Sequence, residues 1–527
     1  MSQQRKNIIY IYADDLGHGM LSCYGQKHFK TPNIDRLAGE GVMFHQAYGT
    51  PFCAPSRACL LTGVHDAHAG RWTFNKAGLY EAHTAGEIGL NEAFELINNT
   101  GIRPRDGQTF LASVAQRAGL LTGQIGKLEW GFSTSPEELV AHGWDYHYGY
   151  YDHFQCHGFY PQYLFENGEK IEFPENTAPR CGSGQYQPYE DGKVPHDPKG
   201  RVTYSQDLFD EKIVEFLRTH KDEDFFLYHP SQLPHGPTYY PDHHPDVAEN
   251  PDLTPCEREY ASMVLRLDET VGVILDELEA LGLADSTMVI FASDNGHETN
   301  YLQPGRCMND RDLEGHPLDE LNHKFYSDTC GDVFDGNGGL AGLKRTNHEG
   351  GARIPFMVRM PNSDRKGVET NHLINNYDTL ATFADYLGVE GISETDGLSY
   401  LPAILGEADA QEHTHVVYSS YYGPALVSAD GWKLRTYIRR DKIVDFPMFG
   451  EWLENLDEAI IYELYNLKED PREEKNVGSE YPDVMKDLQR RLLRECDGNL
   501  FNGMPEAHFA FFDRGSAPKC LGEIRGK

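Results

Sequence analysis

Four hard oxygen ligands follow two strand-like segments of the chain: Asp14, Asp15, Asp294 and Asn295. The first pair comes directly after the apolar run 7–13, and the second pair follows the run 287–293. Such a set, without thiolate or clustered imidazole, favours calcium or magnesium over zinc. The alternative is that each residue only caps a helix or makes a turn. Because the two pairs end two strands of one expected sheet, we predict a metal site.

Five basic or imidazole side chains lie in loops beside glycine and proline: Arg57, Lys127, His235, Lys344 and Arg353. Taken singly, each is typical of a surface charge. At loop positions after strands, such residues become candidates for an anion clamp. A divalent metal ion and several cations around one nucleophile are the usual apparatus for transferring a phosphoryl or sulfuryl group.

Cys53 is the candidate nucleophile of this group. It opens the segment CAPSRACLLTG, in which Pro55, Ser56 and Arg57 stand close beside it. The ten cysteines of the chain form no C-x-x-C pair, so the sequence predicts no zinc or redox site built from thiolates. Most of the other cysteines are expected to be buried thiols, which behave as small hydrophobic side chains.

Three apolar runs are typical of parallel strands that are buried on both faces: 7–13, 225–229 and 287–293. Amphipathic helices alternate with them, and the clearest covers 256–283, where Met263, Leu267 and Val271 recur at helical spacing. This alternation predicts an α/β fold, a large doubly wound sheet between layers of helices. Ligands of such sheets bind outside the carboxyl ends of the strands, so both acidic pairs should converge on one crevice.

After about residue 410 the pattern changes to polar-interrupted strands joined by short turns. The segments HVVYSSYYG, ALVSADGWKLRTY and IYELYNLKED are followed by a helical pattern around PDVMKDLQRRLLREC. They predict a small antiparallel sheet with a helix packed on it. Because 527 residues exceed what one core usually supports, we expect a catalytic domain over 1–410 and a smaller α+β subdomain over 411–527.

The formal net charge of −35 argues against nucleic acid and anionic membranes as partners, since both attract basic surfaces. No apolar run is long enough to span a bilayer, and the start MSQQRKNIIYIYADD lacks the apolar core of a signal peptide. As written, the chain is expected in the cytoplasm, whereas a removed signal peptide would place it in the periplasm or outside the cell. The sequence does not predict an oligomeric state.

The segment CAPSRACLLTG resembles the signature C-x-P-S-R-x-x-x-L-T-G of the type I sulfatases, members of the alkaline phosphatase superfamily. The resemblance continues in family order through YADDLG, TPNIDRLAGEGVMF, GWDYHYGYYD, FFLYHPSQLPHGP, SDNG, KRTNHEGGARIPF and YELYNLKEDPREEKN. It covers most of the chain, and the cysteine signature is its most specific part. The resemblance implies an alkaline phosphatase-like fold and the hydrolysis of sulfate esters.

The resemblance also implies the parts of the catalytic site. A maturation enzyme would read the C-x-P-S-R segment and oxidise Cys53 to formylglycine, whose hydrate attacks through one hydroxyl and expels sulfate through the other. Ca²⁺, in preference to Mg²⁺, would be held by the four oxygen ligands together with the modified Cys53. Arg57 would orient the hydrated aldehyde, while Lys127 and Lys344 would bind sulfate oxygens. His235 would donate a proton to the leaving alcohol, a role suited to imidazole near neutral pH.

One position departs from the common family pattern. Many sulfatases read G-K-W-H-L-G where this chain reads GKLEWG, so Glu129 occupies the place of a histidine thought to assist collapse of the intermediate. A carboxylate there would serve as a base, yet it would also repel sulfate. The segment LTGVHDAHAGRW resembles a branch of bacterial sulfatases with T-G-x-H-x-x-H. We therefore expect His68 as the replacement, with His65 as the second choice.

The expected substrate is a sulfated carbohydrate. Residues 144–163 are dense in aromatic rings and histidine, which are typical either of core packing or of a platform for a sugar. His157 in this segment is expected to contact a sugar hydroxyl, and Arg353, Glu129 and His65 are further candidates for substrate contacts. Similarity to the bacterial branch makes galactose or N-acetylgalactosamine sulfate, from an algal or glycosaminoglycan polysaccharide, the first hypothesis.

Two other functions stay open at this stage. The first is hydrolysis of a phosphate or phosphonate ester, since that chemistry within the same superfamily shares the metal and the cations. The second is a protein without catalytic activity that binds sulfated glycans. In such a protein Cys53 would remain a thiol, and Glu129 would mark the loss of the catalytic histidine. The cysteine signature favours the sulfatase over both.

Overall fold

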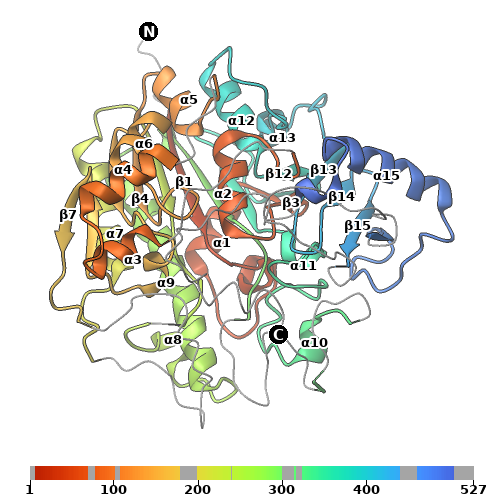
Figure 1. Ribbon diagram of the computed structural model, residues 1–527, viewed down its shortest axis with the longest axis horizontal. Helices are drawn as coiled ribbons and strands as arrows, with labels where there is room; N and C mark the ends of the chain where they lie inside the picture. The colour runs from red at the N-terminus through yellow and green to blue at the C-terminus, as the bar shows by residue number, and fades with distance from the viewer. Residues whose placement is uncertain are drawn as a thin grey trace.

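The structure is a computed structural model that describes residues 6–68, 78–100, 107–177, 199–238, 240–299, 314–315, 323–439 and 460–503. In this part of the chain, a large central sheet has helices on both faces, and a smaller sheet with its own helix lies beside it (Figure 1). None of the described helices is long and apolar enough to cross a membrane.

The central sheet has ten strands in the described part of the chain, in the order β11-β2-β10-β9-β1-β8-β4-β5-β6-β7. Their bounds are β1 Asn7–Ala13, β2 Val42–Phe44, β4 Leu121–Gly126, β5 Tyr146–Gly149, β6 Tyr163–Glu166, β7 Glu169–Glu172, β8 Phe225–Pro230, β9 Thr287–Ser293, β10 Phe356–Arg359 and β11 Val368–Thr370. The middle strands from β9 to β5 are parallel, whereas β10, β6 and β7 run antiparallel to their neighbours. The predicted mixed, doubly wound sheet is confirmed, and the three predicted strands are β1, β8 and β9.

Helices cover both faces of this sheet. Those in the described part of the chain are α1 Pro32–Gly39, α2 Cys53–Thr62, α3 Leu79–Thr84, α4 Leu90–Thr100, α5 Leu111–Arg117, α6 Pro136–His142, α7 Ser205–Thr219, α8 Pro245–Ala248, α9 Pro255–Ala280, α10 Ser327–Cys330, α11 Glu349–Ala352, α12 Asp378–Leu387, α13 Leu401–Leu405 and α15 Pro482–Glu495. The predicted long helix is α9, which begins with a capping box between Thr254 and Glu257. A short two-stranded sheet pairs β3 (Ala47–Tyr48) with β12 (Ile374–Asn375).

The side chains of β1 explain why the sheet is covered twice. Successive residues of a strand point to opposite faces. Ile8 and Tyr10 belong to one core with residues of α2, α5 and α12, while Ile9 and Ile11 belong to a second core with residues of α1, α7 and α9. Every residue of β1 is buried, so a continuous apolar run in the sequence becomes the central strand.

The C-terminal part of the chain forms a separate antiparallel sheet, seen beside α15 in Figure 1. Its strands are β13 His415–Tyr418, β14 Ala425–Ser428, β15 Trp432–Ile438 and β16 Ile460–Asn466. Leu488 and Leu492 of α15 pack with Leu426, Leu434 and Leu464 of the sheet. The predicted small sheet with a packed helix is therefore confirmed, while the division at residue 410 stays a prediction.

A buried lysine joins the small sheet to α11. Lys433 lies on β15 with its side chain fully buried. Its ammonium group is 3.0 Å from Glu349 Oε1 and 2.9 Å from Glu473 Oε1. Buried carboxylates need such partners, because an unpaired charge away from water is costly. The lysine thus fixes the start of α11 against the subdomain.

The neighbouring arginine of β15 fixes the residues just before α11. Arg435 donates to Asn347 Oδ1 and to Glu463 Oε2, both at 2.8 Å. Asn347 in turn donates to the backbone oxygens of Gly423 and Thr436, at 3.0 and 2.8 Å. The loop that leads into α11 is therefore held by the C-terminal subdomain through several independent hydrogen bonds.

Replacing Lys433 by methionine should lower the free energy of unfolding by about 3–5 kcal/mol, because Glu349 and Glu473 would remain buried without their shared cation. Unfolding in urea, followed by circular dichroism, measures the change. Lys475→Met is the matched control, since Lys475 pairs with Glu480 in solvent and should leave the midpoint nearly unchanged. Equal losses in the two variants would contradict the role of the buried network.

Candidate active site

The two acidic pairs meet at the carboxyl ends of β1 and β9. These strands are neighbours, and Ala13 pairs with Ser293, so the residues that follow them leave the sheet side by side. The backbone N–H of Asp15 donates to Asp294 Oδ1 at 3.1 Å, and Asn295 Nδ2 donates to Asp15 Oδ1 at 2.9 Å. Asp14, Asp15 and Asp294 each place a carboxylate oxygen within 4.8 Å of the others. The predicted convergence is confirmed.

Asp14, Asp15, Asp294 and Asn295 together are called the metal corner below. This corner fits a hard divalent cation. Asp14 Oδ1 and Asn295 Oδ1 are buried and have no hydrogen-bond partner among the described residues. Burial and the neighbouring Asp14 raise the pKa of Asp294 to about 7, although Arg57 acts in the opposite direction. Buried oxygens that lack donors, next to carboxylates that repel one another, are the environment in which an oxygen-preferring metal ion binds.

A glycine after Asn295 lets the loop that follows β9 lie close to α11. A Cβ atom added to Gly296, which follows Asn295, would stand 1.8 Å from the backbone oxygen of Gly350. Only glycine permits this approach of the β9 loop to α11. The motif SDNG therefore ends in glycine for a steric reason.

Each acidic residue of the corner is paired with a buried cation from another part of the chain. Lys127 Nζ contacts Asp14 Oδ2, and Lys344 Nζ lies 2.6 Å from Asp15 Oδ1. Burial disfavours both ammonium groups, but Asp14 and Asp15 outweigh it and raise the pKa of each lysine above its usual value. Both lysines therefore stay charged and face the space beside the metal corner.

Helix α2 carries the third cation and the candidate nucleophile. Cys53 is its first residue, and Arg57 lies one turn later on the same face. Arg57 Nη2 donates to Asp294 Oδ2 at 2.8 Å, while Nε and Nη1 are buried without an acceptor among the described residues. Burial raises the pKa of the Cys53 thiol despite Lys127 and Lys344, so the unmodified thiol is a weak nucleophile.

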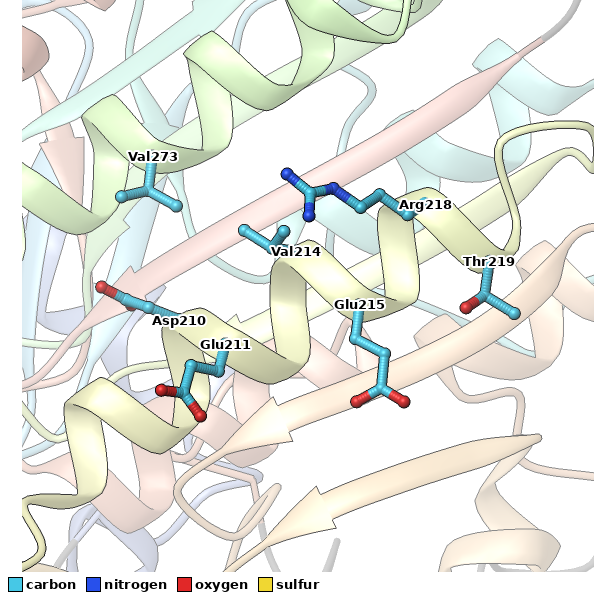
Figure 2. A pocket seen from close by; sticks show the side chains of 7 residues that line it. All are labelled: Asp210, Glu211, Val214, Glu215, Arg218, Thr219 and Val273. Atoms are coloured by element: carbon cyan, nitrogen blue, oxygen red, sulfur yellow. The ribbon is translucent and has the colours of Figure 1, made fainter.

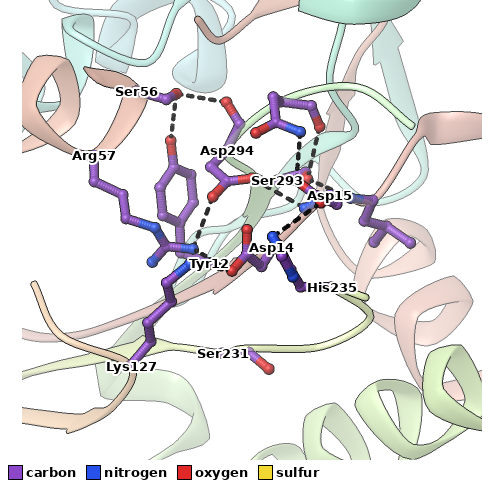
Figure 3. A network of polar contacts seen from close by, with 12 residues as sticks. Tyr12, Asp14, Asp15, Ser56, Arg57, Lys127, Ser231, His235, Ser293 and Asp294 are labelled. Atoms are coloured by element: carbon purple, nitrogen blue, oxygen red, sulfur yellow. Dashed lines mark hydrogen bonds and ion pairs between the residues drawn. The ribbon is translucent and has the colours of Figure 1, made fainter. Parts of the chain in front are cut away.

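Ser56 holds α2 in place against the metal corner, as Figure 3 shows. Its hydroxyl donates to the backbone oxygen of Asp294 at 2.5 Å and lies 3.2 Å from the hydroxyl of Tyr12. Asn376 Nδ2 donates to Ser56 Oγ at 2.7 Å and to its backbone oxygen at 2.8 Å. Sequence reasoning missed Asn376 and Tyr12 here. Asn376 stands in none of the motifs and is 320 residues from Ser56 in the chain, while in YADDLG only the acidic pair was considered and not Tyr12.

Two imidazoles lie side by side next to the cations. The rings of His157 and His235 stack with centroids 3.6 Å apart at an angle of 4°. His157 Nε2 is 3.0 Å from Lys127 Nζ, and His235 Nε2 is 3.2 Å from Lys344 Nζ. Because an ammonium group only donates, both Nε2 atoms accept hydrogen bonds here. Burial, followed by nearby positive charge, lowers the pKa of each imidazole well below its usual value.

Glu129 is turned into the core. Its carboxylate accepts hydrogen bonds from His142 Nδ1 and, at 2.7 Å, from Trp144 Nε1. All three side chains are buried. Its described contacts therefore fix the end of α6 rather than reach the cations around Cys53, and the expected substrate contact stays a prediction.

His65 and His68 lie where the two parts of the chain meet. Their rings stack with centroids 3.9 Å apart. His68 Nε2 is 3.2 Å from Asp396 Oδ1 and its Nδ1 is 3.1 Å from Asp497 Oδ2. His65 Nε2 is 3.5 Å from Glu495 Oε2 at the end of α15. The described contacts of both histidines join α2 to the C-terminal subdomain, and none of them reaches Cys53.

Two further expectations concern substrate contacts. Arg353 pairs with Glu349 at 2.5 Å and donates to Tyr48 OH at 2.8 Å, so its described contacts support α11 and not an anion clamp. The aromatic residues of 144–163 are buried except Tyr146 and Phe154, which are half-buried. Most of the expected sugar platform is thus core packing.

A surface pocket between α7 and α9 has no part in this site. Figure 2 shows its lining, which consists of Asp210, Glu211, Val214, Glu215, Arg218, Thr219 and Val273. None of these is a residue of the metal corner, the cation set or α2. Three carboxylates with one arginine offer neither a nucleophile nor an anion clamp.

Fold and site together define a class: a hydrolase of the alkaline phosphatase superfamily, with metal-binding carboxylates and several cations around one nucleophile. Within that class the chain belongs to the sulfatase family, whose family model, Sulfatase, matches residues 6–389. A second model, N-sulphoglucosamine sulphohydrolase, C-terminal, matches residues 342–497. The protein is therefore a sulfuric ester hydrolase.

Several known proteins resemble the whole chain. An N-acetylgalactosamine-6-O-sulfatase of Bacteroides thetaiotaomicron is 28% identical over 540 residues, which cover 93% of each chain. Human N-acetylgalactosamine-6-sulfatase is 29% identical over 407 residues, covering 76% of this chain and 66% of its own. A solved structure from work on glycosaminoglycan metabolism by Bacteroides thetaiotaomicron has a TM-score of 0.68 at 26% identity, and covers 94% of this chain and 100% of its own.

Proposed function

We propose that this sulfatase removes sulfate from a sulfated carbohydrate, with Ca²⁺ bound at the acidic corner and Cys53 converted to formylglycine by a maturation enzyme. The observation that carries the proposal is the arrangement around the first residue of α2. Lys127, Lys344 and Arg57 each pair with one carboxylate of the metal corner. Lys127 and Lys344 act electrostatically on Cys53, and Arg57 stands one helical turn from it.

The metal ion would be held by Asp14, Asp15, Asp294 and Asn295, two of which have buried oxygens that lack donors. When bound, Ca²⁺ supplies a fixed positive charge to a sulfate oxygen and to the group at position 53. The carboxylates fix its position, since their own places are set by β1, β9 and the three paired cations.

The formylglycine hydrate, once present, would supply one hydroxyl that attacks sulfur and a second hydroxyl whose loss of a proton expels sulfate, with its C–O bond, as the aldehyde forms again. Arg57 orients the side chain at position 53 from the same face of α2, and Lys127 and Lys344 bind sulfate oxygens. The positive end of the α2 dipole adds to this field, because Cys53 is the first helical residue. Negative charge that develops on the sulfuryl group is thereby stabilised by fixed cations.

The stacked histidines support the proton transfers. His157 Nε2 is unprotonated and its lone pair accepts from Lys127, so it can take the proton that Glu129 is not placed to take once Lys127 turns its N–H groups to a sulfate oxygen. His235 lies beside Lys344 and is the candidate for protonating the leaving alcohol; because its Nε2 accepts a hydrogen bond from Lys344, the proton it passes on would come from that ammonium group. We assign to His157 the role that the sequence motif suggested for His68.

The class of sugar follows from the relatives alone. The bacterial and the human relative are named as sulfatases of N-acetylgalactosamine at position 6. Galactose or N-acetylgalactosamine sulfate is therefore the first substrate to test. The rival ester hydrolase and the silent binding protein lack a specific observation in their favour.

Sulfate release from 6-O- and 4-O-sulfated galactose and N-acetylgalactosamine should occur with protein whose residue 53 is shown by peptide mass to be the aldehyde. Ion chromatography of free sulfate measures it, and Cys53→Ser is the matched control, expected to lose activity by at least about a thousandfold. Faster cleavage of a phosphate ester than of the matched sulfate ester would favour the rival hydrolase. Aldehyde present with no release from any sugar would refute the substrate class.

Asp294→Ala should lose both the metal ion and the activity, because it removes one carboxylate of the corner and the partner of Arg57. Elemental analysis after dialysis measures calcium per chain, and the shift of the melting temperature on adding Ca²⁺ gives a readout besides activity. Asp483→Ala serves as a control, since Asp483 is an exposed acid in the first turn of α15. Unchanged calcium content in Asp294→Ala would refute the ligand assignment.

His157→Ala should lower kcat by roughly 10²–10⁴-fold, the usual range for losing a general acid or base. His68→Ala should keep kcat within a few-fold and instead lower the melting temperature, because its described partners are Asp396 and Asp497. Steady-state kinetics and thermal unfolding of both variants provide the comparison. The opposite pattern, with kcat lost only in His68→Ala, would return the role to His68.

A further inference from the structure

One arginine stands out in the loop that carries Lys344. From Leu340 to Ala352 each residue is buried except Arg345, whose side chain is 45% exposed. Its neighbour Lys344 points inward to Asp15. Successive residues of one tight loop therefore present one cation to the reaction centre and the other to the outside.

The backbone of Arg345 is held in an unfavourable conformation. Its φ is +76°, in the left-handed region that glycine adopts at little cost and a long side chain does not. Its N–H donates to the backbone oxygen of Pro51 at 2.6 Å, and its own oxygen accepts from the N–H of Tyr421 at 3.2 Å. Glycine would make both backbone hydrogen bonds without strain. An arginine in this strained conformation therefore points to a function of its guanidinium group.

These backbone bonds place Arg345 beside the segment that leads into Cys53. Pro51 is two residues before Cys53, and the ring of Phe52 lies between the two loops, 5.8 Å from the ammonium group of Lys344. Tyr421 meets Phe52 edge to face at 5.5 Å, and both rings are half-buried. The two half-buried rings and the exposed guanidinium group are thus solvent-accessible side chains close to Lys344.

The guanidinium group of Arg345 offers hydrogen-bond donors that suit an anionic partner. Arg345 Nη1 contacts Glu298, which is buried and orients the guanidinium group. A guanidinium group has five N–H donors in a planar fork that matches carboxylate or sulfate oxygens. The chain as a whole carries a formal charge of −35, so a polyanionic sugar approaches against repulsion unless a cation stands at the entrance.

We propose that Arg345 binds a second anionic group of the substrate, a carboxylate or a second sulfate, on the sugar that is being desulfated or on its neighbour. The inference rests on the proposed function and extends it from a sulfated sugar to a multiply charged one. Arg345 then sets substrate preference while Lys344, the next residue inward, binds the sulfate that leaves.

The test compares wild type with Arg345→Gly, which removes the guanidinium group and relieves the backbone strain, so folding should be retained. The substrates are 4-nitrophenyl sulfate, N-acetylgalactosamine 6-sulfate, N-acetylgalactosamine 4,6-disulfate, and a disaccharide with a uronic acid beside a singly sulfated N-acetylgalactosamine. KM should rise by about 10- to 100-fold for at least one of the doubly charged sugars, as expected for losing a charged hydrogen bond. It should change less than about threefold for the two singly charged substrates.

The pattern of losses identifies the second anion. A loss on the disulfate alone indicates sulfate, a loss on the uronic acid disaccharide alone indicates a carboxylate, and a loss on both indicates either group. Arg345→Lys should restore part of the effect, whereas Arg490→Gln on α15 removes the same charge from an exposed site and should change none of the four KM values. Equal losses on all four substrates, or no loss on any, would overturn the proposal.

A measurement of substrate binding makes this test independent of turnover. If wild type releases no sulfate from any of the sugars, the proposed substrate class fails, and calorimetry with the Cys53→Ser protein decides the role of Arg345. The disulfate or the disaccharide should then bind Cys53→Ser at least tenfold more tightly than Cys53→Ser combined with Arg345→Gly. Equal binding, or no binding to either protein, would overturn the inference.

Discussion

The pairing of three buried carboxylates with three buried cations is the constraint on which the site depends. Asp14 pairs with Lys127, Asp15 with Lys344, and Asp294 with Arg57. Neither half of this set is stable alone away from water, because an unpaired buried charge is costly. The carboxylates come from the ends of β1 and β9, whereas each cation comes from a different segment. Charge pairing therefore brings together side chains that are far apart in the sequence.

The C-terminal subdomain contributes to the site, although none of its described residues belongs to the metal corner. Lys433 and Arg435 hold the residues around α11, and the loop that carries Lys344 leads directly into them. Tyr421 of the same subdomain bonds to the backbone of this loop. A cation that must face Asp15 from a loop is thus fixed by a second sheet.

Much of this arrangement can be predicted from the sequence, and the reasons differ by residue. Parallel strands buried on both faces leave continuous apolar runs, so β1, β8, β9 and the acidic residues after them are readable directly. The place of His68 depends on Asp396 and Asp497, which lie 328 and 429 residues away, and no local pattern encodes such a distance. The role of Arg353 had a local signal, since its partner Glu349 stands four residues earlier, at the start of the helix that ends just before Arg353.

The contacts of Ser56 have a consequence for how the protein is made. Cys53 is 1% exposed, and Ser56, three residues later, is fully buried with partners from β1, β9 and the segment before α12. An enzyme that has to read Cys53, Pro55, Ser56 and Arg57 as a free segment can reach them only before these bonds form. Under the proposed maturation, folding and modification would compete during synthesis. A chain that folded first would keep Cys53 as a buried thiol.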